Sequence, residues 1–234
     1  MSNLYKCLFI PVLVLAVYLS GCDKSETRMF PTLDKRAPGS LTESVERDID
    51  TRGIEVRDVY EPGIQLTKDS EGFIKYLYND PADYCTIAFG HLVKLAPCDG
   101  TEPAELLQGV TDAQGTELLV KDMRRSQLSV MQNVKISLTD GQYAALCDFV
   151  FNVGTGNFRS STLLKVINAG NLDGVPFQLM RWVKAGGREL PGLKTRRTNE
   201  IALFFENQAI PRDIPRDVDL TPIDLDQGEL VLAR

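Results

Sequence analysis

Three side chains between residues 71 and 86 have the chemistry needed to cleave a glycosidic bond. Glu71, Asp80 and Thr86 form a Glu-x8-Asp-x5-Thr series. Glycoside hydrolysis requires a protonated carboxyl group on one side of the sugar and a carboxylate on the other that handles water or the anomeric carbon. Unequal burial of two such acids separates their pKa values and so divides the roles of acid and base between them. The series predicts Glu71 as the general acid, with Asp80 and Thr86 acting on the attacking water.

The elements that would position these residues are a helix end and a hairpin. Glu71 lies near the end of an amphipathic helical segment, and Tyr84–Val93 has the pattern of a β-hairpin. Each residue also has a structural interpretation: Asp80-Pro81 starts turns, Thr86 is an ordinary strand residue and Glu71 could be a surface acid. Two acids at this spacing occur by chance in many chains, so the pair alone does not establish a site.

Most of the chain beyond the hairpin is predicted to be helical. Thr111-Asp-Ala-Gln114 and Thr139-Asp-Gly-Gln142 are capping boxes, each with a hydroxyl acceptor and a glutamine three residues later. The second helix has a buried stripe at helical spacing, which consists of Tyr143, Leu146, Cys147 and Val150. Gly154 and Gly156 are expected to end this helix. Ser160 or Ser161 is expected to cap a following helix that runs through Asn168. Further helices are expected around residues 173–184 and 192–206.

Two blocks of sequence contain several motifs in a fixed order. The first runs from Leu66 to Asp80 and continues as Thr86-Ile-Ala-Phe-Gly-His91. The second comprises Leu138–Leu146, Phe149–Gly154, Phe158–Leu164, Arg181–Gly187 and Pro191–Arg197. Over roughly residues 64–206 these motifs resemble the phage-type lysozymes, glycoside hydrolases that cleave peptidoglycan. The resemblance implies an α+β, lysozyme-like fold, with a mainly helical lobe, a small β-hairpin lobe and the cleft between them.

The resemblance also implies roles for individual residues. The family's aligned glutamate protonates the leaving oxygen, which is the role of Glu71, and the chemistry is mostly inverting. His91 matches a family histidine that supports the fold through a carboxylate pair, so we expect structural support in preference to proton transfer. A family arginine pairs with the catalytic glutamate. Arg196 is assigned to that pair and to the substrate site, and its neighbour Arg197, nearly as good a candidate, is assigned to structural support.

Two further residues are predicted to contact the sugar, and one residue departs from the family pattern. Asp148 and Asn152 are one turn apart on the helix expected to line the cleft, which makes them candidate substrate contacts. Ala88 stands where the family commonly has Gly in Thr-Ile-Gly-x-Gly-His. A positive φ at this position would strain the alanine, whereas an ordinary β conformation would tolerate its methyl group.

The beginning of the chain resembles an export signal. A short positive segment precedes the apolar run Cys7–Leu19, which is too short for a comfortable membrane span. The run ends in Leu19-Ser-Gly-Cys22, which resembles the lipobox of bacterial lipoproteins and implies lipidation of Cys22. Asp23 resembles the signal that retains such lipoproteins on the periplasmic side of the inner membrane. An uncleaved anchor, or a signal-anchor-release segment like those of some phage endolysins, is the alternative.

An exported chain meets an oxidising compartment, where cysteines can pair. Cys85 and Cys98 flank the predicted hairpin, so we expect a disulfide between them that stabilises the fold by roughly 3 kcal/mol. Cys147 lies in a dense apolar helix and is expected to be a small core residue. With a single histidine and no Cys-x-x-Cys, neither a zinc site nor another cofactor is expected.

The chain is predicted to contain one catalytic domain with appendages. The expected parts are a lipoprotein-type signal peptide or anchor at 1–22, a flexible tether at 23–62, the lysozyme-like domain at 63–206 and an acidic C-terminal tail at 207–234, either docked or disordered.

Charge suggests the class of partner. The net charge is −6, with an acidic first half of the domain and a basic second half. We expect a monomer that binds peptidoglycan, a polyanion, and does not bind nucleic acid. The basic residues expected to gather are Arg181, Lys184, Arg188, Lys194, Arg196 and Arg197.

Three functions fit these observations. The first is a muramidase that hydrolyses the β-1,4 bond between N-acetylmuramic acid and N-acetylglucosamine, for lysis or wall remodelling. The second is a lytic transglycosylase, which needs one catalytic glutamate and leaves Asp80 and Thr86 unexplained. The third is a lipoprotein that binds peptidoglycan without cleaving it.

Overall fold

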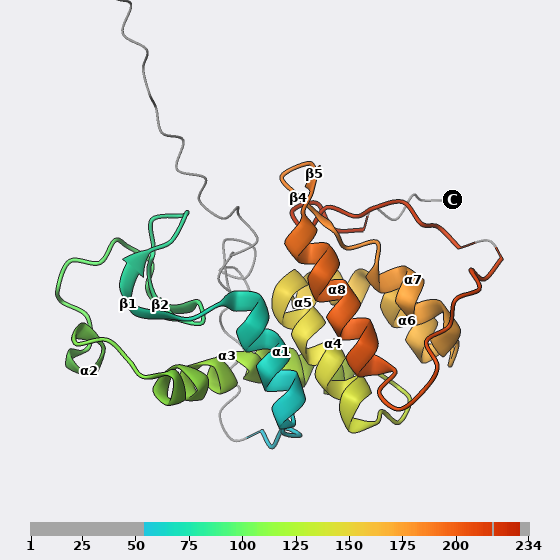
Figure 1. The fold of residues 1–234 in the computed structure, drawn as a ribbon, viewed down its shortest axis with the longest axis horizontal. Coiled ribbons are helices and arrows are strands. Elements are labelled where there is room, and N and C mark those ends of the chain that lie inside the picture. The colour runs from blue at the N-terminus through green and yellow to red at the C-terminus, as the bar shows by residue number, and fades with distance from the viewer. Residues whose placement is uncertain (1–53, 217, 230–234) are drawn as a thin grey trace, which may run out of the picture. The chain divides into compact units, whose positions relative to one another are not determined.

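The fold combines a group of helices with a small antiparallel sheet. A computed structural model describes residues 54–216 and 218–229, which lie in one compact unit (Figure 1). Its helices are α1 (Glu61–Glu71), α2 (Ala104–Leu107), α3 (Asp112–Asn133), α4 (Asp140–Val153), α5 (Thr155–Ser160), α6 (Thr162–Asn168), the 3-10 turn η1 (Leu172–Gly174), α7 (Val175–Leu179) and α8 (Pro191–Phe204). Its strands are β1 (Ile74–Asn79), β2 (Cys85–Ala88), β3 (His91–Lys94), β4 (Lys184–Ala185) and β5 (Arg188–Glu189). This arrangement confirms the predicted α+β, lysozyme-like class.

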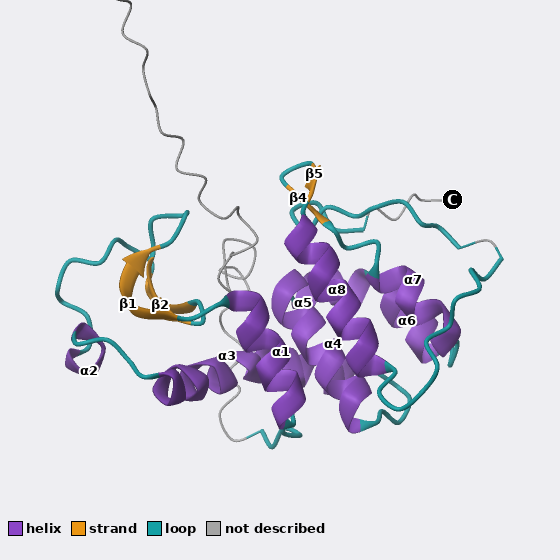
Figure 2. Ribbon diagram, in the orientation of Figure 1, coloured by secondary structure: helices purple, strands orange, loops and turns teal. Residues whose placement is uncertain are grey.

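Helix α4 is the centre of the helical group. Nearly all of its side chains are buried, and it packs against α1, α3 and α8 (Figure 2). Thr139 forms the predicted capping box with Gln142, and Thr111 forms the other with Gln114 at the start of α3. Both boxes satisfy backbone N–H groups that a helix start leaves without partners. The buried stripe predicted for this helix is correct, and Cys147 is a buried, unbridged core residue.

Several predicted helix boundaries were imprecise. Gly154, with φ of 86°, ends α4 as expected, but Gly156 lies inside α5. Ser161 caps α6 by accepting a hydrogen bond from the N–H of Leu164. The helix expected at 173–184 is only the short α7, because the chain then leaves the helix and enters the β4–β5 hairpin. Within the described residues, no helix has the length and apolar content of a bilayer span.

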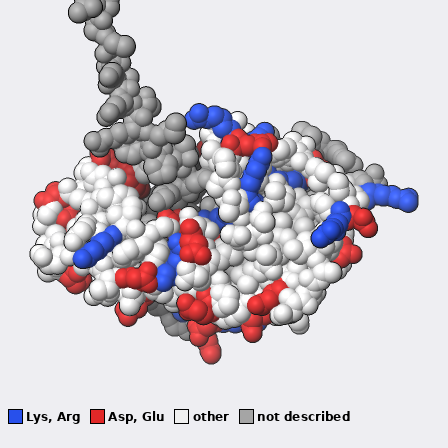
Figure 3. All heavy atoms as spheres, viewed as in Figure 1, with Lys and Arg blue, Asp and Glu red and all other residues white. Residues whose placement is uncertain are grey.

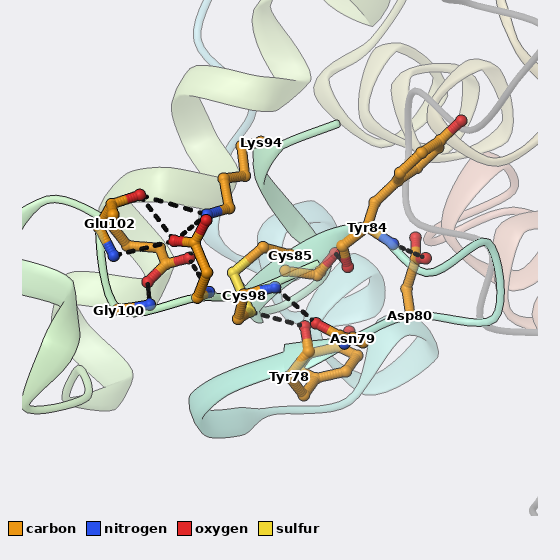
Figure 4. The surroundings of a disulfide bond; sticks show 12 residues. Tyr78, Asn79, Asp80, Tyr84, Cys85, Lys94, Cys98, Gly100 and Glu102 are labelled. Carbon is orange, nitrogen blue, oxygen red and sulfur yellow. Dashed lines mark hydrogen bonds and ion pairs between the residues drawn. A yellow bond between two sulfur atoms is a disulfide. The ribbon is translucent and has the colours of Figure 1, made fainter. Parts of the chain in front are cut away.

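The three-stranded sheet has the order β1-β2-β3, and a disulfide at the start of β2 links it to the loop that follows β3. Strand pairing is antiparallel, and α3 packs against both β2 and β3. Cys85 and Cys98 form the expected disulfide (Figure 4). Beside it, the Glu102 carboxylate accepts hydrogen bonds from the N–H groups of Asp99 and Gly100 and pairs with Lys94 at 2.7 Å. Small sheets are marginal on apolar burial alone, so this loop network supplies part of the missing order.

Ala88 has the left-handed backbone conformation that favours glycine. Its φ is 59°, so the strained alternative considered for this position applies, at a cost of about 1–2 kcal/mol. The methyl group is nevertheless fully buried. A Cβ on the neighbouring Gly115 would lie 3.0 Å from it and 2.9 Å from the ring of Phe73, so the absence of a side chain there makes room for the methyl group. Packing therefore offsets part of the strain.

The domain begins earlier than residue 63. Of the segment expected to be a tether, residues 54–60 pack on the helices, where Arg57 pairs with Asp140 at 2.6 Å and its carbonyl accepts the hydroxyl of Tyr143. Val59 is buried, and α1 already starts at Glu61. A tether extending to residue 62 is therefore too long. The expected signal peptide, the expected lipobox with Cys22 and the part of the expected tether up to residue 53 lie outside the described residues.

The last described stretch of the C-terminal tail is docked, whereas residues 207–216 are mostly exposed. Residues 218–229, which we call the C-terminal strap, lie along the β4–β5 hairpin, where Lys184 and Asp224 form a parallel bridge. Ile223 is buried in the apolar core. The strap carboxylate Glu229 accepts hydrogen bonds from Arg181 at 2.7 Å and from the N–H and hydroxyl groups of Thr162 at 2.6 Å each. Of the two alternatives for the tail, docking is the one observed.

The strap allows a matched test of buried and exposed ion pairs on one arginine. Arg181 contacts Glu229, whose side chain is 8% exposed, and Asp219, whose side chain is 62% exposed. We expect Glu229→Ala to lower the free energy of unfolding by about 3 kcal/mol, because Arg181 and the start of α6 lose a buried acceptor. Asp219→Ala should cost less than about 1 kcal/mol because water screens that pair. Urea unfolding of both variants gives the comparison, and equal losses would show that the strap is not anchored through Glu229.

Candidate active site

Glu71 is the last residue of α1 and is held by a buried arginine. Gly72, with φ of 71°, ends the helix directly after it. The Glu71 carboxylate accepts a hydrogen bond from Nη1 of Arg196 on α8 at 2.7 Å, and both side chains are at most 4% exposed. The predicted pairing of Arg196 with Glu71 is present in the structure. The helix end therefore presents one carboxyl group with a fixed cationic neighbour.

Arg196 is shared among several carboxyl groups. The Asp148 carboxylate on α4 accepts two hydrogen bonds from Arg196, one from Nε at 3.0 Å and one from Nη2 at 2.8 Å. One carboxylate therefore binds two nitrogens of the guanidinium. Glu200, one turn along α8, lies 3.8 Å from Nε. Although burial favours the neutral form of an arginine, Asp148 and Glu71 raise the pKa of Arg196 above its ordinary value. The guanidinium is thus permanently charged in a dry site.

The pKa values of two acids in this cluster, Asp148 and Glu200, are shifted in opposite directions. Burial by itself would raise the pKa of Asp148, but the charge and hydrogen bonds of Arg196 hold it below its ordinary value. Burial raises the pKa of Glu200 well above its usual range, and the charge of Asp148 adds to the effect while Arg197 opposes it. Both side chains are buried next to the Arg196 guanidinium, Asp148 on α4 and Glu200 on α8. Asp148 is the charged member of this pair and Glu200 the neutral one.

Asp80 and Thr86 lie at the other side of the candidate site, at the start of the sheet. Asp80 follows β1, and its carboxylate accepts hydrogen bonds from the N–H groups of Ala82 at 2.8 Å and Tyr84 at 2.9 Å (Figure 4). These bonds close the turn that the Asp-Pro sequence predicts. Thr86 on β2 is buried, and its hydroxyl donates to the carbonyl of Tyr84 at 3.1 Å. The hydroxyl oxygen keeps its lone pairs available to accept a hydrogen bond from water.

Tyr78 connects the two sides of the site and was missed in the sequence. It is the cross-strand partner of Thr86 and stands two residues before Asp80. Burial raises the pKa of its phenol to about 12, and the charges of Asp80 and Glu71 contribute in that order. Both carboxylates therefore lie close enough to act on one phenol. The sequence signal for Tyr78 is only its strand spacing from Asp80, which does not distinguish it from other strand tyrosines.

His91 is tied to α3. Its Nδ1 lies 2.8 Å from the Asp122 carboxylate, which joins β3 to the long helix. This contact fits the structural support expected for His91, and the sequence alone had not identified Asp122 as its partner. We keep the supporting role as the interpretation of this histidine.

Burial argues against the predicted sugar contacts on α4 and α8. Asp148 is fully buried with both oxygens bonded to Arg196, so it cannot also bind substrate. Arg196 is 4% exposed and its guanidinium is occupied by carboxylates, which likewise excludes the substrate contact assigned to it. Asn152 is partly exposed, but its amide oxygen accepts a hydrogen bond from Arg197. The amphipathic spacing identified the correct helix face and misjudged what that face contacts.

The predicted basic surface is smaller than expected. Arg181, Arg196 and Arg197 are buried in ion pairs. Arg197 also lies over the ring of Phe149, at 4.8 Å from its centroid, and is structural as expected. On the face shown in Figure 3, basic and acidic side chains alternate near the β4–β5 hairpin and form no single positive field. A polyanion at this face would therefore contact separate basic side chains and not one continuous basic surface.

The described residues contain one close group of metal-ligand types, Cys85, Cys98 and Glu102. The two sulfurs are bonded to each other, and Lys94 and two backbone N–H groups occupy the carboxylate. These residues do not fit a metal ion.

Comparison with known proteins gives the family. The phage lysozyme family model matches residues 68–200. A SAR-endolysin of bacteriophage PS119 is 34% identical over 163 residues, which cover 69% of this chain and 92% of the relative. A mutant P22 lysozyme is 30% identical with a TM-score of 0.56, over 63% of this chain and 98% of that structure. The muramidase domain of SpmX from Asticaccaulis excentricus is 26% identical with a TM-score of 0.55, over 63% and 98%.

The family match spans the end of α1, the sheet and all helices up to the middle of α8, so it includes every residue of the candidate site. Together with the relatives and the fold, it shows that this chain belongs to the phage lysozyme family.

Proposed function

We propose that the chain is a muramidase that hydrolyses the β-1,4 bond between N-acetylmuramic acid and N-acetylglucosamine. Membership of the phage lysozyme family makes it a peptidoglycan hydrolase of the glycosidase class. The observation that supports the finer assignment is the placement of the three residues: Glu71 ends α1 directly before the sheet, Asp80 closes the turn between β1 and β2, and Thr86 lies on β2 opposite Tyr78. Glycoside cleavage requires one acid that donates a proton and a second carboxylate that acts on water or the anomeric carbon.

Glu71 is the proposed general acid. It is 6% exposed, and burial favours a neutral carboxyl group. Its position at the C-terminus of α1 acts in the same direction, because the partial negative charge of a helix end disfavours a carboxylate. Arg196 opposes both effects, then stabilises the carboxylate that forms once the proton has moved to the leaving oxygen. The residue can therefore carry a proton and release it.

Asp80 and Thr86 are the proposed partners of the attacking water. The Asp80 carboxylate is fixed by backbone N–H groups, so its orientation does not depend on substrate. The Thr86 hydroxyl donates to the Tyr84 carbonyl and so receives a water hydrogen, which turns the oxygen of that water toward the anomeric carbon. Because Glu71 and Thr86 are both buried, the working enzyme has to open to admit the sugar.

The acid assignment is tested by Glu71→Gln. We expect the rate of release of reducing ends from purified peptidoglycan to fall by about 10²–10⁴-fold, because the amide cannot protonate the leaving oxygen. Glu117→Gln, an exposed change on α3, is the matched control and should retain parental activity. Mass spectrometry of the products separates the other functions, since anhydro ends indicate a transglycosylase and binding without products indicates a binding protein. Parental lysis by a folded Glu71→Gln protein excludes Glu71 as the acid.

The water-holding role is tested by Thr86→Val, which keeps the shape of the side chain and removes the hydroxyl. We expect kcat to fall by about 10²-fold or more while the melting temperature stays within a few degrees. Thr195→Val, an exposed change on α8, controls for the substitution itself. Product NMR adds the stereochemistry, and an initial α-anomer supports inversion by a water held at Thr86. An unchanged kcat would remove Thr86 from the mechanism.

We propose export to the periplasmic side of the inner membrane, with lipid anchoring at Cys22. The lipobox sequence supports the anchor, and the SAR-endolysin relative supports export while favouring a signal-anchor-release segment as the other route. Lysis by a phage enzyme and wall remodelling by a cellular one use the same bond cleavage.

The anchor is tested by Cys22→Ser in cells labelled with a fatty acid. The parental protein should carry the label and sediment with membranes, and the variant should lose both properties because it lacks the thiol that lipidation modifies. Cys7→Ser, a second cysteine change in the leader, is the control and should keep the label. A Cys22→Ser protein that stays with membranes as before would indicate an uncleaved anchor.

A further inference from the structure

The charge of Arg196 opposes protonation of Glu71, the proposed general acid. Glu71 must be neutral to donate a proton, yet it is hydrogen-bonded at 2.7 Å to a buried guanidinium. A buried cation without a counter-ion is strongly unfavourable, so a site containing only this pair would keep Glu71 ionised. Something else has to balance Arg196 whenever Glu71 carries its proton.

Asp148 has the geometry of that counter-ion. It binds Arg196 through two oxygens at 3.0 Å and 2.8 Å, whereas Glu71 binds it through one. It is fully buried, and although burial opposes its charge, Arg196 holds its pKa below the ordinary value. Glu200, the only other carboxyl group in contact with Arg196 among the described residues, lies farther away, at 3.8 Å from Nε, and burial raises its pKa well above the usual range.

The remaining charged and titratable groups around Glu71 do not replace Asp148. On the sheet side, Tyr78 stays neutral and Asp80 adds negative charge. On α8, Arg197 is itself a cation, which donates a hydrogen bond to Asn152 and lies 3.2 Å from Glu200, and so cannot balance Arg196. On α1 itself, Lys68 pairs with Asp112 at 2.6 Å. Among the described contacts, neutralisation of Arg196 independently of Glu71 therefore depends on α4.

We propose that Asp148 is a positioning residue for the general acid: by holding Arg196 on two sides and balancing its charge, it allows Glu71 to take up a proton while remaining in place. The inference rests on the proposed role of Glu71 and extends it. Asp148 touches neither sugar nor water in this scheme and acts only through Arg196. Without its charge, Glu71 becomes the principal counter-ion of the guanidinium and keeps its own charge to lower pH.

The variant Asp148→Asn tests this with two measurements. In the first, the pH dependence of kcat/KM on soluble peptidoglycan fragments is compared with that of the parent. We expect the alkaline limb, where the general acid loses its proton, to move to lower pH by roughly one unit or more. Activity should therefore recover when the variant is assayed on the acidic side. Asp173→Asn, an exposed change in η1, is the matched control and should leave the profile in place.

The second measurement is independent of turnover. The side-chain carboxyl signal of Glu71 is followed by ¹³C NMR during a pH titration and assigned by its absence in Glu71→Gln. Its midpoint should fall in Asp148→Asn and return toward the parental value in Asp148→Glu, which restores the charge. If Asp148→Asn does not fold, Asp148→Ser removes the same charge from a smaller side chain and is measured in its place.

The outcomes separate the two proposals. A Glu71 midpoint that is unchanged in a folded, neutral variant at position 148 overturns the positioning role, whatever the activity. A shifted midpoint together with a Glu71→Gln enzyme that still cleaves peptidoglycan supports the charge coupling and overturns the catalytic assignment. A lowered midpoint with a lowered alkaline limb supports both.

Discussion

The buried charge of Arg196 is the constraint on which the site depends. A guanidinium removed from water must be surrounded by acceptors, and here these come from α1, α4 and α8. The pairs with Glu71 and Asp148 therefore also fix how α8 meets α1 and α4, whereas the contact with Glu200 lies within α8. Such a cluster adds little to stability beyond what an apolar core would give, and its effect is to select one arrangement of these helices. The end of α1, and with it Glu71, is oriented by the same contacts.

The sheet side of the site is ordered by a different means. Its strands are short, and a three-stranded sheet buries little apolar surface. The disulfide, the Glu102 loop contacts and the turn closed by Asp80 provide covalent and hydrogen-bonded restraints instead (Figure 4). Helix α3 joins this side to the helices, since it packs against β2 and also against α4. The sheet is therefore ordered by covalent and hydrogen-bonded restraints, and the helices are ordered by the ion pairs of Arg196.

Local sequence signals predicted the features that local physics controls. Both capping boxes, the Ser161 cap and the pairing of Cys85 with Cys98 need only residues close together in sequence. The contacts of Asp148 could not be read in the same way, because helical spacing shows which face a residue occupies and not what lies opposite. The neighbours Arg196 and Glu200 are visible as an (i, i+4) pair, but their partner on α4 is 48 residues from Arg196. The acidic tail gave no periodic signal, and its docking depends on contacts with residues far away in the sequence: the burial of Ile223, the Glu229 carboxylate and the backbone pairing with Lys184.

The C-terminal strap contacts the segment that leads into α8, the helix that carries Arg196. That helix begins at Pro191 without a side-chain cap. The residue before it, Leu190, is instead held by the carbonyl of Val183 at 2.9 Å, and the adjoining Lys184 exchanges backbone hydrogen bonds with strap residues Ile223 and Leu225. The family match ends at residue 200, before the strap begins. Because Arg196 lies less than two turns into α8, an element that fixes the first turn of this helix also restricts where the guanidinium can lie, and through it the carboxyl group of Glu71.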